Sequence, residues 1–416
     1  MIFTVPVTQA VMERIKGDES VLPDLFRRWP TQDSIKQFEE DLEKASYGRE
    51  AVRPRLQVAL TRFGGFGNTK AVIGREGWLF YQPGLAAVGG PGFLKPAILT
   101  SRAKAALDAG GDAIHPDPRP AILDFHAFLA ARGIKLIVFP VPDKAGMQPA
   151  QLHGRFDARN ARPGRNPDQQ QLVVELESAG VLVFDPAPAR LDPLEPPRFL
   201  QQDTHWTPAW MEEVAGALAG FVRQNVALSS DAPAKRWTAI SKNVARVGDI
   251  VDMLRLPPAQ TLFLPQSVNV HEIHDAAGAP FEARADSDVL LLGDSFSNVF
   301  TLEQMGWGEG AGLAPQLARA LGRDLDVIAQ NDSGAFATRQ LLWNDVTNTD
   351  DGHPDRLAGK RVVIWEFASR ELAVGNWKPL VWPRGPNSRA PATPAKVEPT
   401  LPSLPSPTAP SDGRAP

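Results

Sequence analysis

Cysteine is absent from the 416 residues of this sequence. Its absence excludes disulfide bonds, thiolate metal ligands and a cysteine nucleophile. A chain without cysteine fits the cytosol, and it fits a bacterial periplasm equally well because it avoids random oxidation. The cysteine count therefore excludes kinds of chemistry but does not choose a compartment.

Long apolar runs and a strong net charge are absent too. No stretch reaches the roughly 18 consecutive apolar residues of a membrane-spanning helix. The net charge of -4 gives no electrostatic reason to bind DNA, RNA or an anionic lipid surface, so we expect no nucleic-acid partner. No glycine-rich phosphate loop is present. His271 and His274 lie close in sequence but lack a carboxylate cluster at metalloenzyme spacing, so we predict no metal and no cofactor.

The two ends of the chain differ in composition from its middle. Residues 1–60 are charged and helical in pattern, with Ile35, Phe38 and Leu42 on one helical face. Between residues 383 and 416, ten of 34 residues are proline, and Ser, Thr and Ala make up half of the others. Such a segment cannot bury enough apolar surface to offset its chain entropy, so we expect a disordered tail.

The middle of the chain alternates helical patterns with short apolar strands. A hairpin is predicted around residues 75–77. From about residue 119 onward, the alternation favours an α/β fold with a buried parallel sheet flanked by helices. Residues 226–285 interrupt the rhythm with several short β-like runs, and we expect a β-rich insertion beside the active face. The predicted strands of the main sheet are 134–139, ending at Pro140, and 181–184, 288–292, 325–329 and 361–365.

The sharpest motif is Gly293-Asp294-Ser295, which follows the apolar run 290–292. This spacing predicts Ser295 at the carboxyl end of a strand, where open α/β sheets carry their sites. Gly293 allows a tight turn, and the backbone N–H of Ser295 is free to face a developing oxyanion. The motif alone fits a capped strand end as well as a catalytic nucleophile.

A second motif has the residue types of the other two members of a serine triad. Asp203 and His205 precede Thr207 and Pro208, which are typical of a helix N-cap and a first helical position. A serine hydroxyl needs a base to take its proton, and that base needs a carboxylate to fix its tautomer. We therefore hypothesise a triad of Ser295, His205 and Asp203. Capping of the helix by Asp203, and a surface or core role for His205, are the alternatives.

Together the two motifs resemble a known family. Gly293-Asp294-Ser295-Phe296 resembles the first block of SGNH hydrolases, and Asp203-Thr204-His205-Trp206 resembles their Asp-x-x-His block in a shortened Asp-x-His-Trp form. The second block precedes the serine here. This order resembles the alginate O-acetyltransferase family of AlgJ and AlgX, whose SGNH-like domain is circularly permuted. Further segments similar to that family are 73–81, 141–144, 248–254 and 363–372.

The resemblance implies an SGNH hydrolase-like catalytic domain over residues 61–382. It implies acetyl transfer onto hydroxyls of an exopolysaccharide through an acetyl-serine, with a membrane-bound O-acyltransferase as the partner that supplies the acetyl group. It also implies a periplasmic enzyme anchored to the inner membrane through an N-terminal segment. Residues 1–7 show no signal-peptide pattern, so we expect that segment to lie beyond this sequence. The same triad would serve a carbohydrate acetylesterase, and a degenerate site would leave a polysaccharide-binding protein of an export complex.

Weaker candidates for oxyanion and substrate contacts each have a structural alternative. Asn331 and Gly334 follow a predicted strand and could supply oxyanion donors or form an ordinary strand-to-helix turn. Lys144 could hold an acidic sugar or polarise an ester, or it could be a solvated lysine at a strand end. Arg370 could bind a carboxylate or pair with Glu366 or Glu371. Trp206 and Trp78 are candidates for stacking on a sugar, with core packing as the alternative.

Overall fold

The computed structural model describes residues 14–16, 47–156, 161–192, 194–230, 234–331, 334–348 and 355–383. The predicted helical face of Ile35, Phe38 and Leu42 lies outside the described residues, as does the predicted tail after Pro383. None of the described helices is long and apolar enough to cross a membrane.

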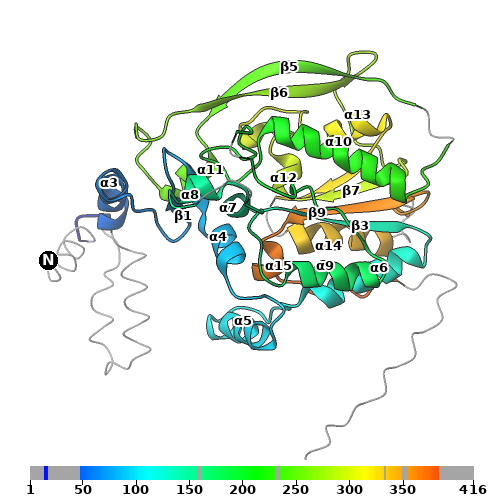
Figure 1. The fold of residues 1–416 in the computed structure, drawn as a ribbon, viewed down its shortest axis with the longest axis horizontal. Coiled ribbons are helices and arrows are strands. Elements are labelled where there is room, and N and C mark those ends of the chain that lie inside the picture. The colour runs from blue at the N-terminus through cyan, green and yellow to red at the C-terminus, as the bar shows by residue number, and fades with distance from the viewer. Residues whose placement is uncertain are drawn as a thin grey trace, which may run out of the picture. The chain divides into compact units, whose positions relative to one another are not determined.

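Five parallel strands form the central sheet, in the order β4-β3-β9-β7-β8 (Figure 1). Each strand corresponds to one of the five predicted apolar runs, and every pairing between neighbours is parallel. The predicted α/β class with a buried parallel sheet is therefore confirmed. The strands are β3 (Lys135–Val141), β4 (Leu182–Val183), β7 (Val289–Gly293), β8 (Asp326–Ala329) and β9 (Val362–Ala368).

Strand β3 differs from the prediction at its end, because it continues through Pro140 to Val141. The carbonyl of Val138 accepts a hydrogen bond from the Phe184 N–H at 2.9 Å, on the side of β4. Pro140 follows two residues later and so faces the same side, where β4 has already ended at Val183. A proline at this position removes no hydrogen bond from the ladder.

Helices cover both faces of this sheet (Figure 1). Alternate strand residues enter two separate apolar clusters: Ile364 packs with residues of α10 and α13, and Val363 with residues of α6 and α9. This alternation explains why the strands read as continuous apolar runs. The helices on the first face are α10 (Pro208–Asn225) and α13 (Leu313–Leu321), and those on the second are α6 (Pro118–Ala130), α9 (Gln169–Ser178) and α14 (Gly334–Thr347).

Shorter elements precede the sheet and follow its strands. The predicted hairpin is present as β1 (Ala71–Ile73) and β2 (Leu79–Tyr81), which pair antiparallel. The helix before it, α3, spans Tyr47–Gly64. Further helices among the described residues are α4 (Gln82–Gly89), α5 (Pro96–Asp108), α7 (Lys144–Met147), α8 (Pro149–Leu152), α11 (Asp249–Leu254), α12 (Ser295–Asn298), α15 (Glu371–Val374) and the 3-10 turn η2 (Glu303–Met305).

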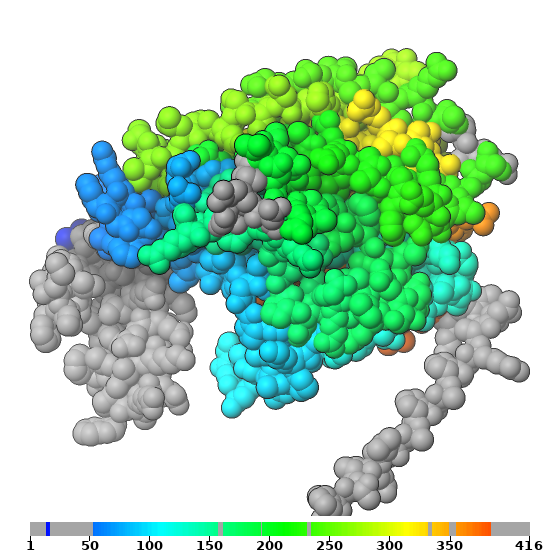
Figure 2. Space-filling view, viewed as in Figure 1, coloured from blue at the N-terminus to red at the C-terminus, as the bar shows by residue number. Residues whose placement is uncertain are grey.

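The segment 226–285 is rich in β-structure, as predicted, but it holds one long two-stranded ribbon and not several short strands. Strands β5 (Trp237–Arg246) and β6 (Gln266–Asp275) pair antiparallel over ten residues each. Figure 2 shows the ribbon on the surface above the atoms of α10. Helix α11 lies in the connection between the two strands, and its first residue reaches the site described below.

A buried charge cluster connects the amino ends of β8 and β9. The Lys360 Nζ lies 3.0 Å from Asp326 Oδ2, and both side chains are completely buried. The same ammonium donates to the carbonyls of Ala285 and Ser287 at 2.5 and 2.7 Å. Arg356 donates to both Asp326 oxygens, at 2.6 and 2.9 Å. Asp326 is therefore the counter-ion of two cations.

We expect Asp326→Ala to lower the free energy of unfolding by about 3–5 kcal/mol, because it leaves the buried Lys360 cation without a carboxylate. Asp345→Ala is the matched control, since Asp345 is 42% exposed and pairs with Arg356 at 3.3 Å. Loss of this exposed pair should cost under about 1 kcal/mol. Denaturant unfolding of both variants measures the difference, and equal losses would contradict the prediction.

Candidate active site

Ser295 begins α12 directly after β7, at the carboxyl edge of the sheet. Between residues 287 and 300, Ser295 alone is not buried. A Cβ atom on Gly293 would lie 2.3 Å from Ser297 Oγ, so close packing inside the turn requires glycine there. Asp294 accepts from the Phe296 N–H at 2.8 Å and, through its other oxygen, from the Ala368 N–H at 2.7 Å. The turn that carries Ser295 is thereby tied to β9.

His205 lies in the loop immediately before α10. Thr207 caps this helix by accepting from the Trp210 N–H at 3.4 Å, and Pro208 stands at its start, as predicted. On the other side, the Leu200 N–H donates to the His205 carbonyl at 3.0 Å. The imidazole also packs edge-on against the ring of Phe296, with 4.9 Å between centroids. The ring is thus held by its own loop and by the residue after Ser295.

The structure brings Ser295, His205 and Asp203 into one hydrogen-bonded line. His205 Nε2 lies 2.9 Å from Ser295 Oγ, and His205 Nδ1 lies 2.6 Å from Asp203 Oδ1. Asp203 and His205 are 2% and 4% exposed. Because Asp203 Oδ1 can only accept, Nδ1 carries the hydrogen and Nε2 is free to accept from the serine hydroxyl. This is the arrangement that a serine nucleophile and its base require.

Two residues that the motifs did not identify complete the surroundings of Asp203. The Asp249 N–H and the Trp307 indole donate to Asp203 Oδ2 at 3.0 and 2.9 Å. Both oxygens of Asp203 therefore face donors, which suits a carboxylate and no amide. Burial alone would raise the pKa of Asp203. The hydrogen bond and charge of His205, together with the hydrogen bonds from the Asp249 N–H and the Trp307 indole, instead hold the pKa of Asp203 well below its usual range.

Asp249 places a second carboxylate beside the imidazole. Its two oxygens accept from the Thr204 N–H at 2.7 Å and from the Thr204 hydroxyl at 2.6 Å. Asp249 Oδ2 lies 3.9 Å from His205 Nδ1. Burial and the charge of Asp203 raise the pKa of Asp249 to about 6. A Cβ on Gly248 would lie 2.2 Å from the Gln202 carbonyl, so glycine permits this close approach of α11 to the loop.

Both carboxylates act on the base. Burial tends to lower the pKa of His205, but the hydrogen bond and charge of Asp203, with the charge of Asp249, raise it above its usual value.

Ligand atoms of Asp203, His205 and Asp249 lie within 4.8 Å of one another, a spacing that could hold a metal ion. Their oxygens already accept the hydrogen bonds described above, so we interpret the set as part of the hydrogen-bonded line. His271 and His274 lie three apart on β6, on opposite faces, and His271 binds Glu212 at 2.7 Å.

Lys144 is buried and bonded within the protein, so neither alternative given for it, a substrate contact or a solvated lysine at a strand end, describes it. Its ammonium donates to the carbonyls of Leu79, Gln201 and Asp203 at 2.6, 3.0 and 3.0 Å. These three bonds use all the donors of an ammonium group. Burial lowers the pKa of Lys144 to about 7, although the charges of Asp203 and Asp249 favour its protonated form. Lys144 therefore fixes the Asp203 loop to β2.

Neither tryptophan that was expected to stack on a sugar has an open ring face. Trp206 has no exposed area and packs edge-on against Phe296 and Trp210. Trp78 is 8% exposed and packs on Phe80, with the Lys144 ammonium 5.1 Å from its ring. Stacking on a sugar needs an accessible face, so core packing is the correct interpretation of both rings here.

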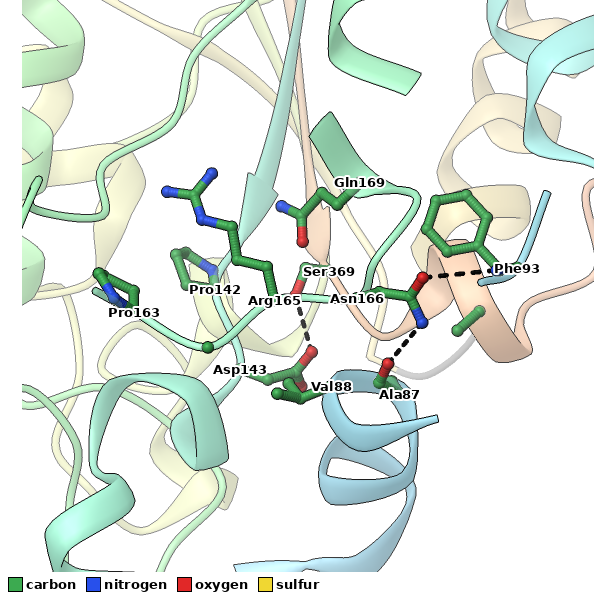
Figure 3. A pocket seen from close by; sticks show the side chains of 12 residues that line it. Ala87, Val88, Phe93, Pro142, Asp143, Pro163, Arg165, Asn166, Gln169 and Ser369 are labelled. Atoms are coloured by element: carbon green, nitrogen blue, oxygen red, sulfur yellow. Dashed lines mark hydrogen bonds between the residues drawn. The ribbon is translucent and has the colours of Figure 1, made fainter. Parts of the chain in front are cut away.

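Arg370 lies beside the Ser295 turn, at the carboxyl end of β9. Its guanidinium lies 5.8 Å from the centre of the Phe296 ring. Its ion-pair partner is Asp143, at 3.9 Å, and not Glu366, which was one of the alternatives. Burial raises the pKa of Asp143 to about 6, and the Ser369 hydroxyl donates to it at 2.7 Å. Asp143 also lines a small pocket, together with Arg165, Asn166, Gln169 and Ser369 (Figure 3).

The three expected oxyanion donors have different surroundings. The Ser295 N–H donates to none of the residues that the structure describes, so it remains available. The Asn331 side chain accepts from Asn298 at 2.8 Å and lies 3.6 Å from Met305 Sδ. Gly334 is the first residue of α14. Oxyanion roles for Asn331 and Gly334 stay predictions.

The fold is α/β, with a serine at the carboxyl edge of its parallel sheet and a His–Asp pair that precedes this serine in the chain. These features are those of the SGNH hydrolase-like class of enzymes in permuted order. The chain belongs to the family of the SGNH hydrolase-like domain of the acetyltransferase AlgX, whose model matches residues 71–369. By family, the protein is an acetyltransferase.

Similar proteins carry related names. The chain is 25% identical over 325 residues to the probable alginate O-acetylase AlgJ of Pseudomonas syringae pv. tomato, covering 74% of this chain and 71% of that protein. It is 25% identical over 327 residues to the probable alginate O-acetylase AlgJ of Pseudomonas aeruginosa, covering 74% and 72%. Among solved structures, the O-acetyltransferase domain of Pseudomonas putida AlgJ is 22% identical, with a TM-score of 0.49, covering 74% of this chain and 93% of that one.

Proposed function

We propose that this protein is a periplasmic polysaccharide O-acetyltransferase that works through an acetyl group carried on Ser295. The observation that carries the proposal is the hydrogen-bonded line from Ser295 through His205 to Asp203. Relatives named alginate O-acetylases support hydroxyls of an exopolysaccharide as the acceptor. In this proposal a membrane-bound O-acyltransferase supplies the acetyl group.

The first half-reaction loads Ser295. His205 Nε2 takes the hydroxyl proton while Ser295 Oγ bonds to the carbonyl carbon of the acetyl donor. The Ser295 N–H faces the oxygen on which negative charge develops. The imidazolium then gives its proton to the departing oxygen of the donor, the bond from that oxygen to the carbonyl carbon breaks, and the acetyl group stays on Ser295.

The second half-reaction unloads the acetyl-serine onto the sugar. A sugar hydroxyl gives its proton to His205 Nε2 as its oxygen attacks the acetyl carbon. Collapse of the tetrahedral intermediate returns this proton to Ser295 Oγ and releases the acetylated sugar. Asp203 stays ionised throughout, because donors face both of its oxygens, and its charge stabilises the imidazolium in both halves.

The experiment that tests this function is product partitioning. The enzyme is incubated with a chromogenic acetate ester and an oligosaccharide, and acetylated sugar and free acetate are quantified by mass spectrometry. Acetylated sugar that disappears with Ser295→Ala is the expected result. Free acetate alone at saturating acceptor would indicate an acetylesterase. Absence of both products, with no labelling by a serine-directed reagent, would indicate a binding protein.

A pH dependence follows from the second carboxylate. The activity requires neutral His205, so kcat/KM should rise with pH through the raised pKa of this histidine. The charge of Asp249 contributes to that raised pKa, and Asp249→Asn removes it while keeping the shape of the side chain. We therefore expect the acidic limb of the kcat/KM profile to move to lower pH in Asp249→Asn. An unchanged limb, or one moved to higher pH, would contradict this role.

A further inference from the structure

Glu366 lies in the middle of β9, directly beneath the turn that carries Ser295. Its side chain has no exposed area. One oxygen, Oε2, accepts from the Asp294 N–H at 3.0 Å and from the Ser297 hydroxyl at 2.6 Å. These two donors stand on either side of Ser295 in the chain. The carboxyl group of Glu366 therefore holds the turn before and after the nucleophile.

The surroundings of Glu366 do not suit an ionised carboxylate. No lysine, arginine or histidine of the described residues forms an ion pair with it, and its second oxygen, Oε1, meets no donor. Its charged neighbour is another carboxylate, Asp294, which accepts a backbone N–H at each oxygen. Each carboxyl group accepts two hydrogen bonds, but Asp294 accepts one at each oxygen, whereas Glu366 accepts both at Oε2 and none at Oε1. An ionised Glu366 would therefore leave negative charge on a buried oxygen that faces no donor.

Other titratable groups near this turn do not supply Glu366 with a counter-ion. Asp143 follows β3, and Arg370 and Glu371 follow β9. Arg370 forms an ion pair with Asp143 at 3.9 Å. Burial lowers the pKa of Arg370, but the charges of Asp143, Asp294 and Glu371 raise it above its usual value. His205 faces Ser295 from the other side. Burial, followed by the charge of Asp294, raises the pKa of Glu366 well above its usual range.

We propose that Glu366 acts as a neutral carboxylic acid that positions the nucleophile. It is a positioning residue, because it acts on Ser295 only through Asp294 and Ser297. The proposal rests on the proposed role of Ser295. Glu366 keeps its own proton through the reaction, and no bond to this residue forms or breaks.

Two substitutions separate a neutral acid from a charged one. Glu366→Gln keeps a neutral group whose amide oxygen can accept from both donors, so kcat/KM should stay within about threefold of wild type. Glu366→Leu fills a similar volume but leaves both donors unpaired, so kcat should fall by at least about tenfold. A Gln variant that loses as much activity as the Leu variant, or that fails to fold, would overturn the proposal, because Gln reproduces the hydrogen bonds of the neutral acid.

A second measurement does not depend on catalysis. The folded protein binds a proton that the unfolded chain releases above the usual glutamate pKa of 4.5. The free energy of unfolding of the wild type therefore falls as pH rises above that value, because only the folded protein holds this proton. Glu366→Gln has no such proton, so its stability does not change for this reason. We expect the Tm of Glu366→Gln, relative to wild type, to increase between about pH 5 and about pH 8. A constant difference would overturn the neutral state.

The two proposals fail in different ways. If Ser295→Ala keeps full acetyl transfer, the proposed function fails while the pH-dependent difference in Tm still stands. If acetyl transfer depends on Ser295 but the Tm difference is flat, the role of Glu366 fails alone.

Discussion

Ser295→Ala should lower kcat/KM for acetyl transfer by at least about 10⁴-fold while leaving Tm nearly unchanged. The substitution removes the atom that bonds to the acetyl carbon. Ser295 is partly exposed, and the hydrogen bond that its side chain forms with the described residues is the 2.9 Å contact with His205 Nε2. Loss of this contact should cost under about 1 kcal/mol of folding stability.

The control for this variant is Ser241→Ala, the same chemical change on the exposed strand β5. Steady-state kinetics with a chromogenic acetate and an oligosaccharide acceptor measure both variants. Turnover that survives Ser295→Ala would show that the chemistry lies elsewhere in the molecule.

Asp203→Asn should lower the rate of acyl-enzyme formation by about 10³–10⁴-fold. Both oxygens of Asp203 accept N–H groups: His205 on one side, Asp249 and Trp307 on the other. An amide must turn its own N–H groups toward one of these sides. It then either favours the wrong imidazole tautomer or leaves two buried donors unpaired, which should also lower stability by about 1–3 kcal/mol.

The alternative role for Asp203, capping of α10, does not apply because Thr207 caps that helix. Asp249→Asn is the matched control: it makes the same substitution on the adjacent carboxylate and should change the pH profile but retain activity. The pre-steady-state burst with a chromogenic acetate measures the acylation rate. A burst rate for Asp203→Asn within about threefold of wild type would remove Asp203 from the proposed line, since loss of an orienting carboxylate should cost several kcal/mol.

Local patterns were sufficient to predict the sheet and to indicate that Ser295, His205 and Asp203 belong to one site. A strand buried on both faces must be apolar along its whole length, and this property identified all five strands of the sheet. Ser295 follows such a strand, and His205 precedes a helix with recognisable capping residues. Both positions follow from short-range chemistry, which is why two separate motifs could indicate one site.

The rest of the site depends on contacts that local patterns do not contain. Asp249, Trp307 and Glu366 reach their partners across 46, 104 and 72 residues of sequence. The residue types at Lys144 and Trp206 fit a binding surface and a buried support equally well. Burial decided between these roles, and burial is set by tertiary packing.

The most direct test of the account is to find the acetyl group on the enzyme. The protein is mixed with an acetate ester, quenched in acid and digested, and its peptides are examined by mass spectrometry. We expect one acetyl group on the peptide that contains Ser295, which accumulates without acceptor and disappears when an oligosaccharide is added. Acetylated sugar formed with no acetyl group on this peptide, or an acetyl group that turns over on a different residue, would contradict this expectation.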